Sequence, residues 1–411
     1  MITTTQNRTK IGKVMAVGLL VATLLAMVLA STRADAAVSA GSALAWGDNF
    51  FGQLGNDTHG EGTNTNIPVA VRNISGVKSV KAGCAHGLAL KENGLVRAWG
   101  DNSSGQLGNA NTGTDTDVPV AINIENVKAI AAGCSHSLAL KENGTVWAWG
   151  YNYYGQLGND TSGAGTDKNL PVRVANIGTG AKAIAAGDNF SLALMKDGTV
   201  RSWGRNGDGE LGNGAVELSD TPGPVSNLSN VKAIATDSYA RHALALKTDG
   251  TVRSWGRNVS GQLGNGASLP AIEKRTPVRV ANLTGVQAIA AGGDHSLALM
   301  ESGRIKSWGN NNQGELGNGD HGDSADRSTP GSVIGLENVR SISGGGYHSL
   351  AVLESGRARA WGDNSSGQLG NGNTGTDTDV PVAVKDLSNV TTLSGVRSVD
   401  GGGGFTLAAT Q

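Results

Sequence analysis

The unit that decides the fold is clearest in residues 133–159, which read GCSHSLALKENGTVWAWGYNYYGQLGN. Apolar and small residues alternate on both sides of Asn143-Gly144, which favours β-strands. The Asn-Gly pair between them is typical of a tight hairpin turn. We therefore predict two antiparallel strands, followed by a glycine-rich turn that runs from Trp149 to Asn159.

The same unit recurs along the chain. A V-x-A-I-A-A-G-x-x-H-S-L-A-L stretch, as in residues 127–140, precedes each copy of Trp-Gly from the second onward. Each repeat of about 52 residues predicts an antiparallel sheet of about four strands, which must stack on its neighbours to bury its faces. The seven Trp-Gly pairs begin at Trp46, Trp99, Trp149, Trp203, Trp255, Trp308 and Trp361.

The two halves of the repeat are out of phase at the chain ends. The first Trp-Gly pair has no V-x-A-I-A-A-G stretch before it, and the last such stretch, residues 396–409, has no Trp-Gly pair after it. We therefore expect residues 42–46 and 396–409 to share one sheet, which closes the repeats into a ring and removes exposed sheet edges. The predicted fold is an all-β, seven-bladed β-propeller over residues 37–411.

Residues 1–36 have the features of a secretory signal peptide. Three basic residues precede an uncharged run from Val14 to Ala30, and Ala34-Asp35-Ala36 has the small-x-small pattern of a cleavage site. An uncleaved membrane anchor is the alternative, but the run is shorter than the ~20 residues that span a bilayer. We expect residues 37–411 to be secreted, periplasmic or at the cell surface, with no later membrane span.

The charge of the chain argues against nucleic acid as a partner. The formal net charge is -1, and residues 1–36 hold four basic residues against Asp35, so the remainder carries -4. A phosphate backbone requires a basic footprint, which this remainder lacks. We expect a monomer that binds no nucleic acid.

The pairing of G-x-x-H-S-L-A-L at residues 133–140 with W-G-x-N-x-x-G-Q-L-G-N at residues 149–159 resembles the repeat of the regulator of chromosome condensation (RCC1) family. The resemblance covers residues 42–411. It implies a seven-bladed propeller whose turns bind another protein. The family includes a nuclear guanine-nucleotide exchange factor for a small GTPase and a secreted bacterial inhibitor of β-lactamases. Together with the signal sequence, the resemblance implies a bacterial secreted member.

One repeat position holds an aromatic or imidazole ring in every blade. A ring of metal-binding histidines is one interpretation, but two blades carry phenylalanine there without other change. We therefore expect a structural position in which the ring packs between blades and the nitrogen bonds to backbone, with no metal. The position is occupied by His86, His136, Phe190, His242, His295, His348 and Phe405.

Other motifs do not indicate catalysis. The Gly-x-Gly-x-x-Gly matches that begin at Gly207, Gly317 and Gly370 precede loops, whereas a dinucleotide site needs a helix there, so we expect no cofactor. No nucleophile, base and orienting group occur in a recognisable arrangement. We expect no enzyme activity.

The cysteines and two Asp-x-Asp motifs leave alternatives open. Cys84 and Cys134 occupy equivalent places in consecutive repeats, and they form either a disulfide, if their turn lies close to the ring axis, or two buried thiols. Asp115-x-Asp117 and Asp377-x-Asp379 have carboxylates that calcium uses, but they lack the glycine and closing glutamate of a hand-type loop. We interpret the aspartates as solvated loop residues.

Seven of the nine Phe and Tyr residues lie in turns. If the strand that starts at the histidine position runs up and the Trp-Gly strand runs down, the turn before the first and the turn after the second share one end of the ring. Aromatic rings in such a place are typical of partner binding, although they can instead pack on neighbouring turns. The seven residues are Phe50, Phe51, Tyr151, Tyr153, Tyr154, Tyr239 and Tyr347.

These features indicate a secreted, non-enzymatic propeller that binds a protein partner, as a scaffold or an inhibitor. One alternative is a guanine-nucleotide exchange factor, although export would separate the chain from cytosolic GTPases. A second is a carbohydrate-binding or cell-surface propeller, in which the same aromatic rings stack on sugars.

The signal sequence gives a direct prediction. Cleavage after Ala36 makes Ala37 the first residue of the exported protein, and N-terminal sequencing of secreted material measures this. Recovery of Met1 would contradict cleavage and favour an anchor.

Overall fold

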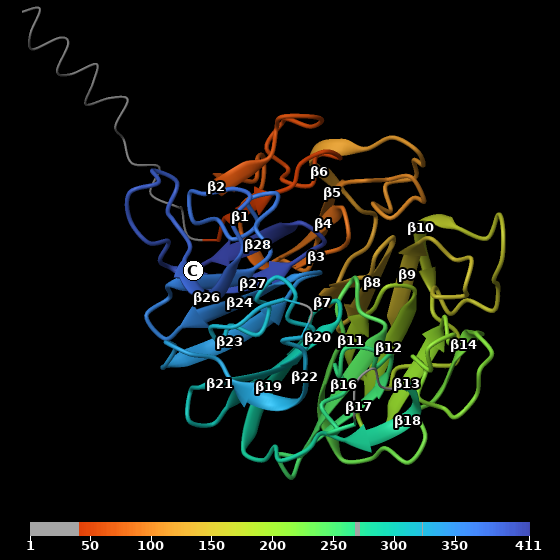
Figure 1. Ribbon diagram of the computed structural model, residues 1–411. Coiled ribbons are helices and arrows are strands. Elements are labelled where there is room, and N and C mark those ends of the chain that lie inside the picture. The colour runs from red at the N-terminus through yellow and green to blue at the C-terminus, as the bar shows by residue number, and fades with distance from the viewer. Residues whose placement is uncertain (1–40, 268–271, 323) are drawn as a thin grey trace, which may run out of the picture. The chain divides into compact units, whose positions relative to one another are not determined.

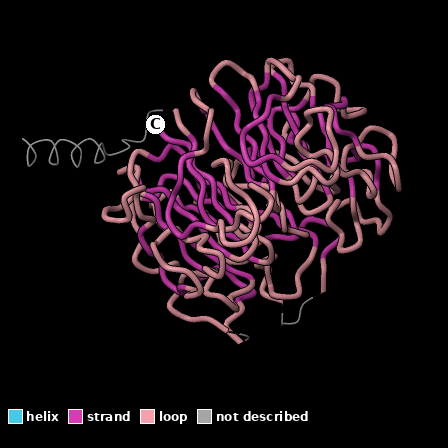
Figure 2. The backbone as a smooth tube through the Cα atoms, turned by 90° about the horizontal axis from the view of Figure 1, so that it is seen from above, coloured by secondary structure: helices cyan, strands magenta, loops and turns pink. Residues whose placement is uncertain are grey.

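The computed structural model describes residues 41–267, 272–322 and 324–411, so the expected signal peptide lies outside the described residues. The described chain consists of strands and loops (Figure 2). Its strands form seven four-stranded antiparallel sheets around a common axis (Figure 1), which confirms the predicted seven-bladed propeller. Among these residues no helix has the length and hydropathy that crossing a membrane requires.

We name the blades A to G in ring order. Blade A contains β27, β28, β1 and β2, and blades B to G contain β3–β6, β7–β10, β11–β14, β15–β18, β19–β22 and β23–β26. The strands nearest the axis are β27 (Val396–Gly401), β3 (Val77–Ala82), β7 (Val127–Ala132), β11 (Ala181–Ala186), β15 (Val231–Ala235), β19 (Val286–Ala291) and β23 (Val339–Gly344). The second strands are β28 (Phe405–Thr410), β4 (His86–Lys91), β8 (His136–Lys141), β12 (Phe190–Met195), β16 (His242–Lys247), β20 (His295–Met300) and β24 (His348–Leu353).

The third strand of each blade ends in Trp-Gly, and the fourth lies at the outer edge. The third strands are β1 (Ala43–Gly47), β5 (Val96–Gly100), β9 (Val146–Gly150), β13 (Val200–Gly204), β17 (Val252–Gly256), β21 (Ile305–Gly309) and β25 (Ala358–Gly362). The fourth strands are β2 (Thr65–Ala70), β6 (Thr116–Ala121), β10 (Lys168–Arg173), β14 (Ser219–Pro224), β18 (Lys274–Arg279), β22 (Arg327–Ser332) and β26 (Thr378–Ala383).

Burial along the strands follows from their place between two sheets. In β8 every residue except Lys141 is buried, because neighbouring blades cover both faces of the strand. The outer strands are half-exposed, and each contains a proline, such as Pro171 in β10 or Pro381 in β26. Proline has no N–H to donate, so it limits pairing of the outer edge with another chain.

The ends of the chain meet in blade A. Residues Ala43 to Gly47 of β1 pair with Ala409 to Phe405 of β28, in the sheet order β2-β1-β28-β27. Figure 1 shows this as red strands beside blue ones. The predicted closure of the ring is therefore confirmed.

A tryptophan indole joins each blade to the one before it. All seven Trp side chains of the Trp-Gly pairs are fully buried, and each Nε1–H donates to a backbone carbonyl in the turn of the preceding blade. The bonds measure 2.8–2.9 Å and run from Trp46 to Gln368, Trp99 to Gln53, Trp149 to Gln106, Trp203 to Gln156, Trp255 to Glu210, Trp308 to Gln262 and Trp361 to Glu315.

The closing sheet predicts how a truncation will behave. Deleting residues 396–411 removes β27 and β28, leaves β1 without its inner partner and exposes edges in two blades, so the whole ring should lose cooperative unfolding in thermal melts. A matched control is a circular permutant that joins Gln411 to Gly41 through a short linker and opens the hairpin at Asn143, which keeps every strand and should melt cooperatively. A truncated chain with an unchanged melting profile would contradict closure as the source of stability.

Candidate functional site: the Trp-Gly face

The turns after the Trp-Gly pairs and the turns before the histidine position lie at the same end of the ring. In each blade the first backbone N–H after Trp-Gly donates to the carbonyl of the residue before the histidine position. Asp101 N donates to Ala85 O, Arg205 N to Asn189 O and Asp363 N to Tyr347 O, each at 2.9 Å. We call this end, defined by these two sets of turns, the Trp-Gly face.

A buried asparagine holds the turn after each Trp-Gly pair. In blade C, Asn152 Oδ1 accepts from Leu157 N at 2.9 Å, and Asn152 Nδ2 donates to Thr161 O at 2.9 Å. Gln156 Oε1 accepts from Tyr154 N at 3.0 Å, which fixes the tip of the turn. The tip therefore has a backbone held by Asn152 and Gln156, on which Tyr153 is exposed and Tyr154 is half-buried.

The next blade also shapes this turn. Gly158 has φ +63°, and a Cβ on it would lie 2.7 Å from Nε1 of Trp203 in blade D. Any side chain there would displace the indole that joins the two blades. The glycine that recurs at this place in the repeats is thus explained by the interface with the next blade.

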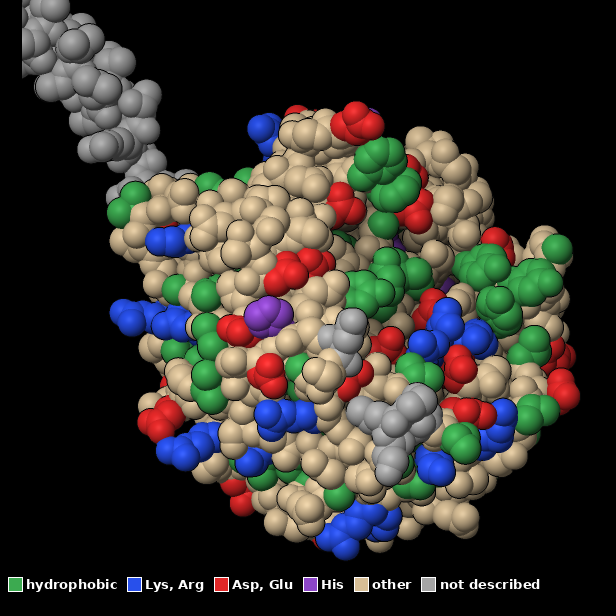
Figure 3. Space-filling model, in the orientation of Figure 1, with side chains coloured by type: hydrophobic (Ala, Val, Ile, Leu, Met, Phe, Trp, Pro, Cys, Tyr) green, Lys and Arg blue, Asp and Glu red, His purple; other side chains and the backbone are tan. Residues whose placement is uncertain are grey.

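The structure places all seven expected aromatic residues on the Trp-Gly face, in three groups. Phe50 and Phe51 pack edge to face with ring centroids 5.0 Å apart. Tyr153 lies 5.2 Å from Tyr154 and 6.4 Å from Tyr151. Tyr239 and Tyr347 form the third group. Figure 3 shows hydrophobic side chains on the visible face in separate patches rather than one continuous surface.

Tyr239 and Tyr347 lie at the axis, with ring centroids 6.3 Å apart. Tyr239 belongs to a loop of blade E that is two residues longer than its equivalents, because seven positions separate Ala235 from His242 where five is usual. The loop reaches across the ring, since a Cβ on Gly403 of blade A would lie 2.7 Å from Tyr239 Cε2. Burial raises the pKa of Tyr239, and Tyr347 and nearby carboxylates add to this.

Five of these rings are exposed enough to meet a partner. Phe50 is 51 % exposed, Tyr153 48 %, Tyr347 43 %, Tyr239 40 % and Phe51 37 %. Rings of this size rarely stay open to water at several places on one face unless something covers them. Sequence reasoning located these residues but did not anticipate their division into three groups, which depends on where each blade lies in the ring.

The two cysteines form a disulfide at the axis. Cys84 of blade B and Cys134 of blade C are bonded, with their Cα atoms 4.5 Å apart. Ser238 of the long blade E loop lies directly beside them, with its carbonyl oxygen 3.6 Å from Cys84 Sγ. The disulfide therefore joins two blades where the loop crosses the axis.

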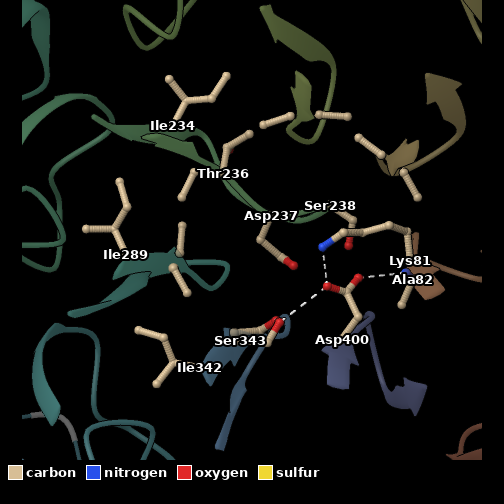
Figure 4. Close-up of a pocket in the computed structure, with 18 of the residues that line it drawn as sticks. Lys81, Ala82, Ile234, Thr236, Asp237, Ser238, Ile289, Ile342, Ser343 and Asp400 are labelled. Carbon is tan, nitrogen blue, oxygen red and sulfur yellow. Dashed lines mark hydrogen bonds and ion pairs between the residues drawn. The ribbon is translucent and has the colours of Figure 1, made fainter. Parts of the chain in front are cut away.

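A cavity of about 200 Å³ lies on the axis beneath this loop. Figure 4 shows Asp237, Ser343, Lys81 and Asp400 pointing into it from different blades. Lys81 Nζ and Asp400 Oδ1 are 2.5 Å apart, and Ala82 N donates to Asp400 Oδ2 at 2.8 Å. Burial raises the pKa of Asp237 well above its usual range, with the Asp400 charge adding to the effect.

The histidines serve the blade interfaces. Each Nε2 lies 2.8–3.0 Å from a hydroxyl of the next blade, where we expected a backbone partner. Because Ser137 Oγ itself donates to Gln106 O at 2.9 Å, it accepts from His86 Nε2–H. The pairs are His86–Ser137, His136–Ser191, His242–Ser296, His295–Ser349 and His348–Thr406.

The two phenylalanines at the histidine position face residues without a hydroxyl. Phe190 and Phe405 cannot donate, and the residues of the next blades at the hydroxyl position are Ala243 and Gly87. Histidine thus occurs with a hydroxyl in the following blade, and phenylalanine occurs with none. This covariation is present in the sequence, but it becomes visible only when the blade contacts are known.

Burial keeps the histidines neutral. It lowers the pKa of His136, His242 and His295 to about 3, and that of His86 and His348 to about 4. In the described part of the chain no group of three or more His, Cys, Asp or Glu side chains can hold a metal ion.

The loop aspartates brace turns. Asp115 Oδ1 accepts from Asn102 N and Asp377 Oδ1 accepts from Asn364 N, both at 2.9 Å. Asp117 Oδ2 lies 2.8 Å from His59 Nδ1, and the Asp379–His321 pair at 3.0 Å repeats this contact between blades F and G. Asp115 and Asp377 are exposed, as we expected of solvated loop residues, and all four carboxylates also have protein partners.

Charge is distributed unevenly at the first position after Trp-Gly. Adjacent blades G, A and B carry Asp363, Asp48 and Asp101, whereas blades D and E carry Arg205 and Arg257. Arg205 Nη1 lies 2.6 Å from Glu210 Oε1, and Arg257 Nε lies 3.3 Å from Asp294 Oδ1. The arginines are therefore neutralised within the protein.

A pocket of about 340 Å³ lies among these groups, next to the axis. Two tyrosine rings and two guanidinium groups line it, with two carboxylates between them. Its mixed lining suits a polar side chain of a larger partner better than an apolar small molecule. The lining residues include Tyr239, Tyr347, Arg241, Arg257, Asp188 and Asp294.

The depressed histidine pKa values predict a sensitivity to acid. The folded pKa lies below the ordinary value of 6.5, so the unfolded chain binds protons first and stability falls as the pH drops from 6.5 towards about 3. At pH 5 each buried histidine should lower the free energy of unfolding by about 2 kcal/mol. The His136→Phe/Ser191→Ala variant copies the Phe190–Ala243 interface, so it should reduce the difference in unfolding free energy between pH 7.5 and pH 5 by about that amount.

Urea unfolding at the two pH values measures this difference. Ser191→Ala alone is the control, because it keeps the titrating ring. An unchanged difference in the double variant would show that His136 does not titrate on unfolding.

Comparisons with known proteins agree with this architecture. Residues 5–274 match the model of the RCC1-like domain. Residues 286–315, 302–352, 339–368 and 355–409 match models of the regulator of chromosome condensation (RCC1) repeat. Together the matches cover the described ring except residues 275–285 and 410–411.

Individual proteins show the same similarity. The ultraviolet-B receptor UVR8 of Arabidopsis thaliana is 32% identical over 83% of this chain. The chain spans less than two thirds of the length of the curated relatives it matches, 65% in the case of this receptor.

Solved structures match in three dimensions. Prp20p of Saccharomyces cerevisiae, whose structure was described together with its binding properties to Gsp1p and histones, is 27% identical with a TM-score of 0.79. The match covers 91% of this chain and 92% of Prp20p. Yeast RCC1 bound to Kap60 gives 26% identity, the same TM-score, and coverage of 91% and 89%. The chain belongs to the RCC1-like domain family.

Proposed function

We propose that this chain is a secreted, non-catalytic propeller that binds a protein partner through the Trp-Gly face. The observation that carries the proposal is the set of exposed aromatic rings on turns whose backbone does not need them. Phe50-Phe51 and Tyr153-Tyr154 occupy the tip positions that Ser103-Ser104 occupy in blade B. Ser104 N donates to Gln106 Oε1 at 2.9 Å, as Phe51 N does to Gln53 Oε1 at 2.8 Å.

The relatives support protein binding. The titles of the two yeast structures describe complexes or binding with other proteins, Gsp1p, histones and Kap60. The pocket beside Tyr239 and Tyr347 lies near the centre of the face, where residues that dominate binding energy usually cluster.

The disulfide supports export. Cys84 and Cys134 are the two cysteines of the chain, and both are used in the bond. Such bonds persist in oxidising compartments outside the cytoplasm. This agrees with the signal sequence at residues 1–36.

The state of the titratable groups supports a role without catalysis. The five histidines at the histidine position are buried and bonded to hydroxyls, so they are not available as general bases. The strongly perturbed carboxyl of Asp237 lies under the axial loop, next to Lys81 and Asp400. These groups stabilise blade contacts and the axial loop.

Replacing the blade C tip tests the proposal. The Tyr153→Ser/Tyr154→Ser variant copies blade B, so the fold should be kept while binding is lost. Rings that dominate an interface typically contribute ~2 kcal/mol or more, so affinity for a captured partner should fall at least ~30-fold. Residues 37–411 are used as bait with culture supernatant and cell-envelope fractions, and affinity for the captured protein is measured by calorimetry.

Val390→Ser is the matched control, because Val390 is 73 % exposed in the loop between β26 and β27 at the opposite end of the ring. It should keep full affinity. Full affinity of the tyrosine variant would place the interface elsewhere, and unfolding of that variant would show that the rings support the fold.

The match to Prp20p favours a second candidate, regulation of a small GTPase as an exchange factor. Release of a fluorescent guanine nucleotide from a small GTPase tests it. We expect no acceleration by residues 37–411, and an acceleration of about tenfold or more would replace the proposal.

A further inference from the structure

The Phe50–Phe51 pair lies on the middle one of three adjacent blades in which an aspartate directly follows Trp-Gly and the turn carries no Lys or Arg. The turns are residues 362–379 of blade G, 47–64 of blade A and 100–117 of blade B. Figure 3 shows acidic side chains around the upper hydrophobic patch of this face. The carboxylates are Asp363, Asp377, Asp379, Asp48, Asp57, Glu61, Asp101, Asp115 and Asp117.

The three aspartates next to Trp-Gly bond to neutral groups. Gln53 Nε2 donates to Asp48 Oδ2 at 2.8 Å, and the equivalent glutamines donate to Asp101 and Asp363 at 2.6 Å. Among the described residues, no Lys or Arg forms an ion pair with these three carboxylates. The arginines of blades D and E, by contrast, have acidic partners, so uncompensated negative charge lies on one half of the face.

Other groups at this half offset little of the charge. Arg72 Nη1 lies 3.6 Å from Asp57 Oδ2, and both side chains are well exposed, which makes the pair weak. Burial raises the pKa of Asp377, and the nearby Asp363 charge raises it further. The raised pKa of Asp377 therefore reflects the neighbouring negative charge.

The phenyl rings supply an apolar anchor inside this acidic border. Phe50 is 51 % exposed and Phe51 37 %. Their backbone N–H groups are bound by Asp48 Oδ1 at 3.2 Å and Gln53 Oε1 at 2.8 Å, which holds both rings outward. A surface that combines exposed rings with uncompensated carboxylates is complementary to an apolar group flanked by cations.

We infer that blades G, A and B bind a cationic segment of a partner protein, in which Lys or Arg side chains flank an apolar residue that packs on Phe50 and Phe51. The inference rests on the proposed function, because it assigns a partner chemistry to the same face. Attraction between exposed charges weakens as salt is added, so binding should be salt-dependent.

A labelled peptide serves as the probe. It has about ten residues, with lysines on both sides of a central Leu-Phe pair, and a second peptide carries glutamate in place of each lysine. Fluorescence anisotropy measures the Kd of residues 37–411 for each peptide at low salt and at physiological salt. The cationic peptide should bind at least ~10-fold more tightly than the acidic one, and less tightly at the higher salt concentration.

Two variants separate charge from apolar contact. Asp48→Asn/Asp101→Asn/Asp363→Asn introduces the residue that blade F has at this position. There Asn310 Oδ1 accepts from Asn312 N at 3.2 Å, so the equivalent backbone contact should be kept. It should weaken the cationic peptide at least ~10-fold and reduce its salt dependence. Phe50→Ser/Phe51→Ser should weaken the peptide to a similar extent but leave the salt dependence in place.

The control makes the same change of charge at the opposite end of the ring. Asp197→Asn/Asp249→Asn/Glu142→Gln alters hairpin residues, and blade C already has an asparagine there, with Asn143 Oδ1 accepting from Thr145 N at 3.0 Å. This variant should bind the peptide like the wild type. Equal weakening by the control would show that net charge alone acts, and would overturn the inference.

Three further outcomes would also overturn it. The first is full affinity of the aspartate variant, and the second is equal binding of the acidic peptide. The third is a dimer in sedimentation velocity that Phe50→Ser/Phe51→Ser converts to monomer, which would assign the patch to a second copy of the chain. A captured partner that is lost by the tyrosine variant but retained by the aspartate variant would leave the proposed function standing without a cationic partner.

Discussion

The propeller depends on the hydrogen bond from each tryptophan indole to the carbonyl of the preceding blade. A fully buried indole N–H without an acceptor costs about 1–3 kcal/mol, so the turn that supplies the carbonyl must occupy one position. The buried asparagine and the glycine beneath the indole hold it there, as Asn152 and Gly158 do for Trp203. In blade A the same bond runs from Trp46 to Gln368 of blade G, and it closes the ring.

A second contact uses the same carbonyl. Gln106 O accepts from Trp149 Nε1 at 2.8 Å and from Ser137 Oγ at 2.9 Å, and the hydroxyl accepts in turn from His86. In the five blade interfaces that contain a histidine, these bonds form one connected polar network inside an apolar layer. A hydroxyl opposite phenylalanine would lack the imidazole donor of this network, which explains why alanine or glycine occurs there.

Because the interfaces fix the backbone of the turns, the tips can change without effect on the fold. Ser103-Ser104 and Tyr153-Tyr154 have the same backbone contacts with different side chains. The Trp-Gly face is thus a rigid support on which exposed rings and charges vary from blade to blade. The long loop of blade E adds to this variation, because it places Tyr239 over the axis and encloses Asp237 beneath it.

The sequence by itself determined the local structure and the number of blades. Alternation of apolar residues, the Asn-Gly hairpins and the sevenfold Trp-Gly spacing are local signals, and the phase difference at the two ends predicted the shared blade A. Strand direction also placed Phe50 and Tyr347 at the same end of the ring. The contacts between blades were decided by the tertiary structure alone, because they join residues 31 or more positions apart. The hydroxyl partner of each histidine, the separation of the rings into three groups and the acidic border around Phe50 all depend on which blades are neighbours, and no local pattern records that.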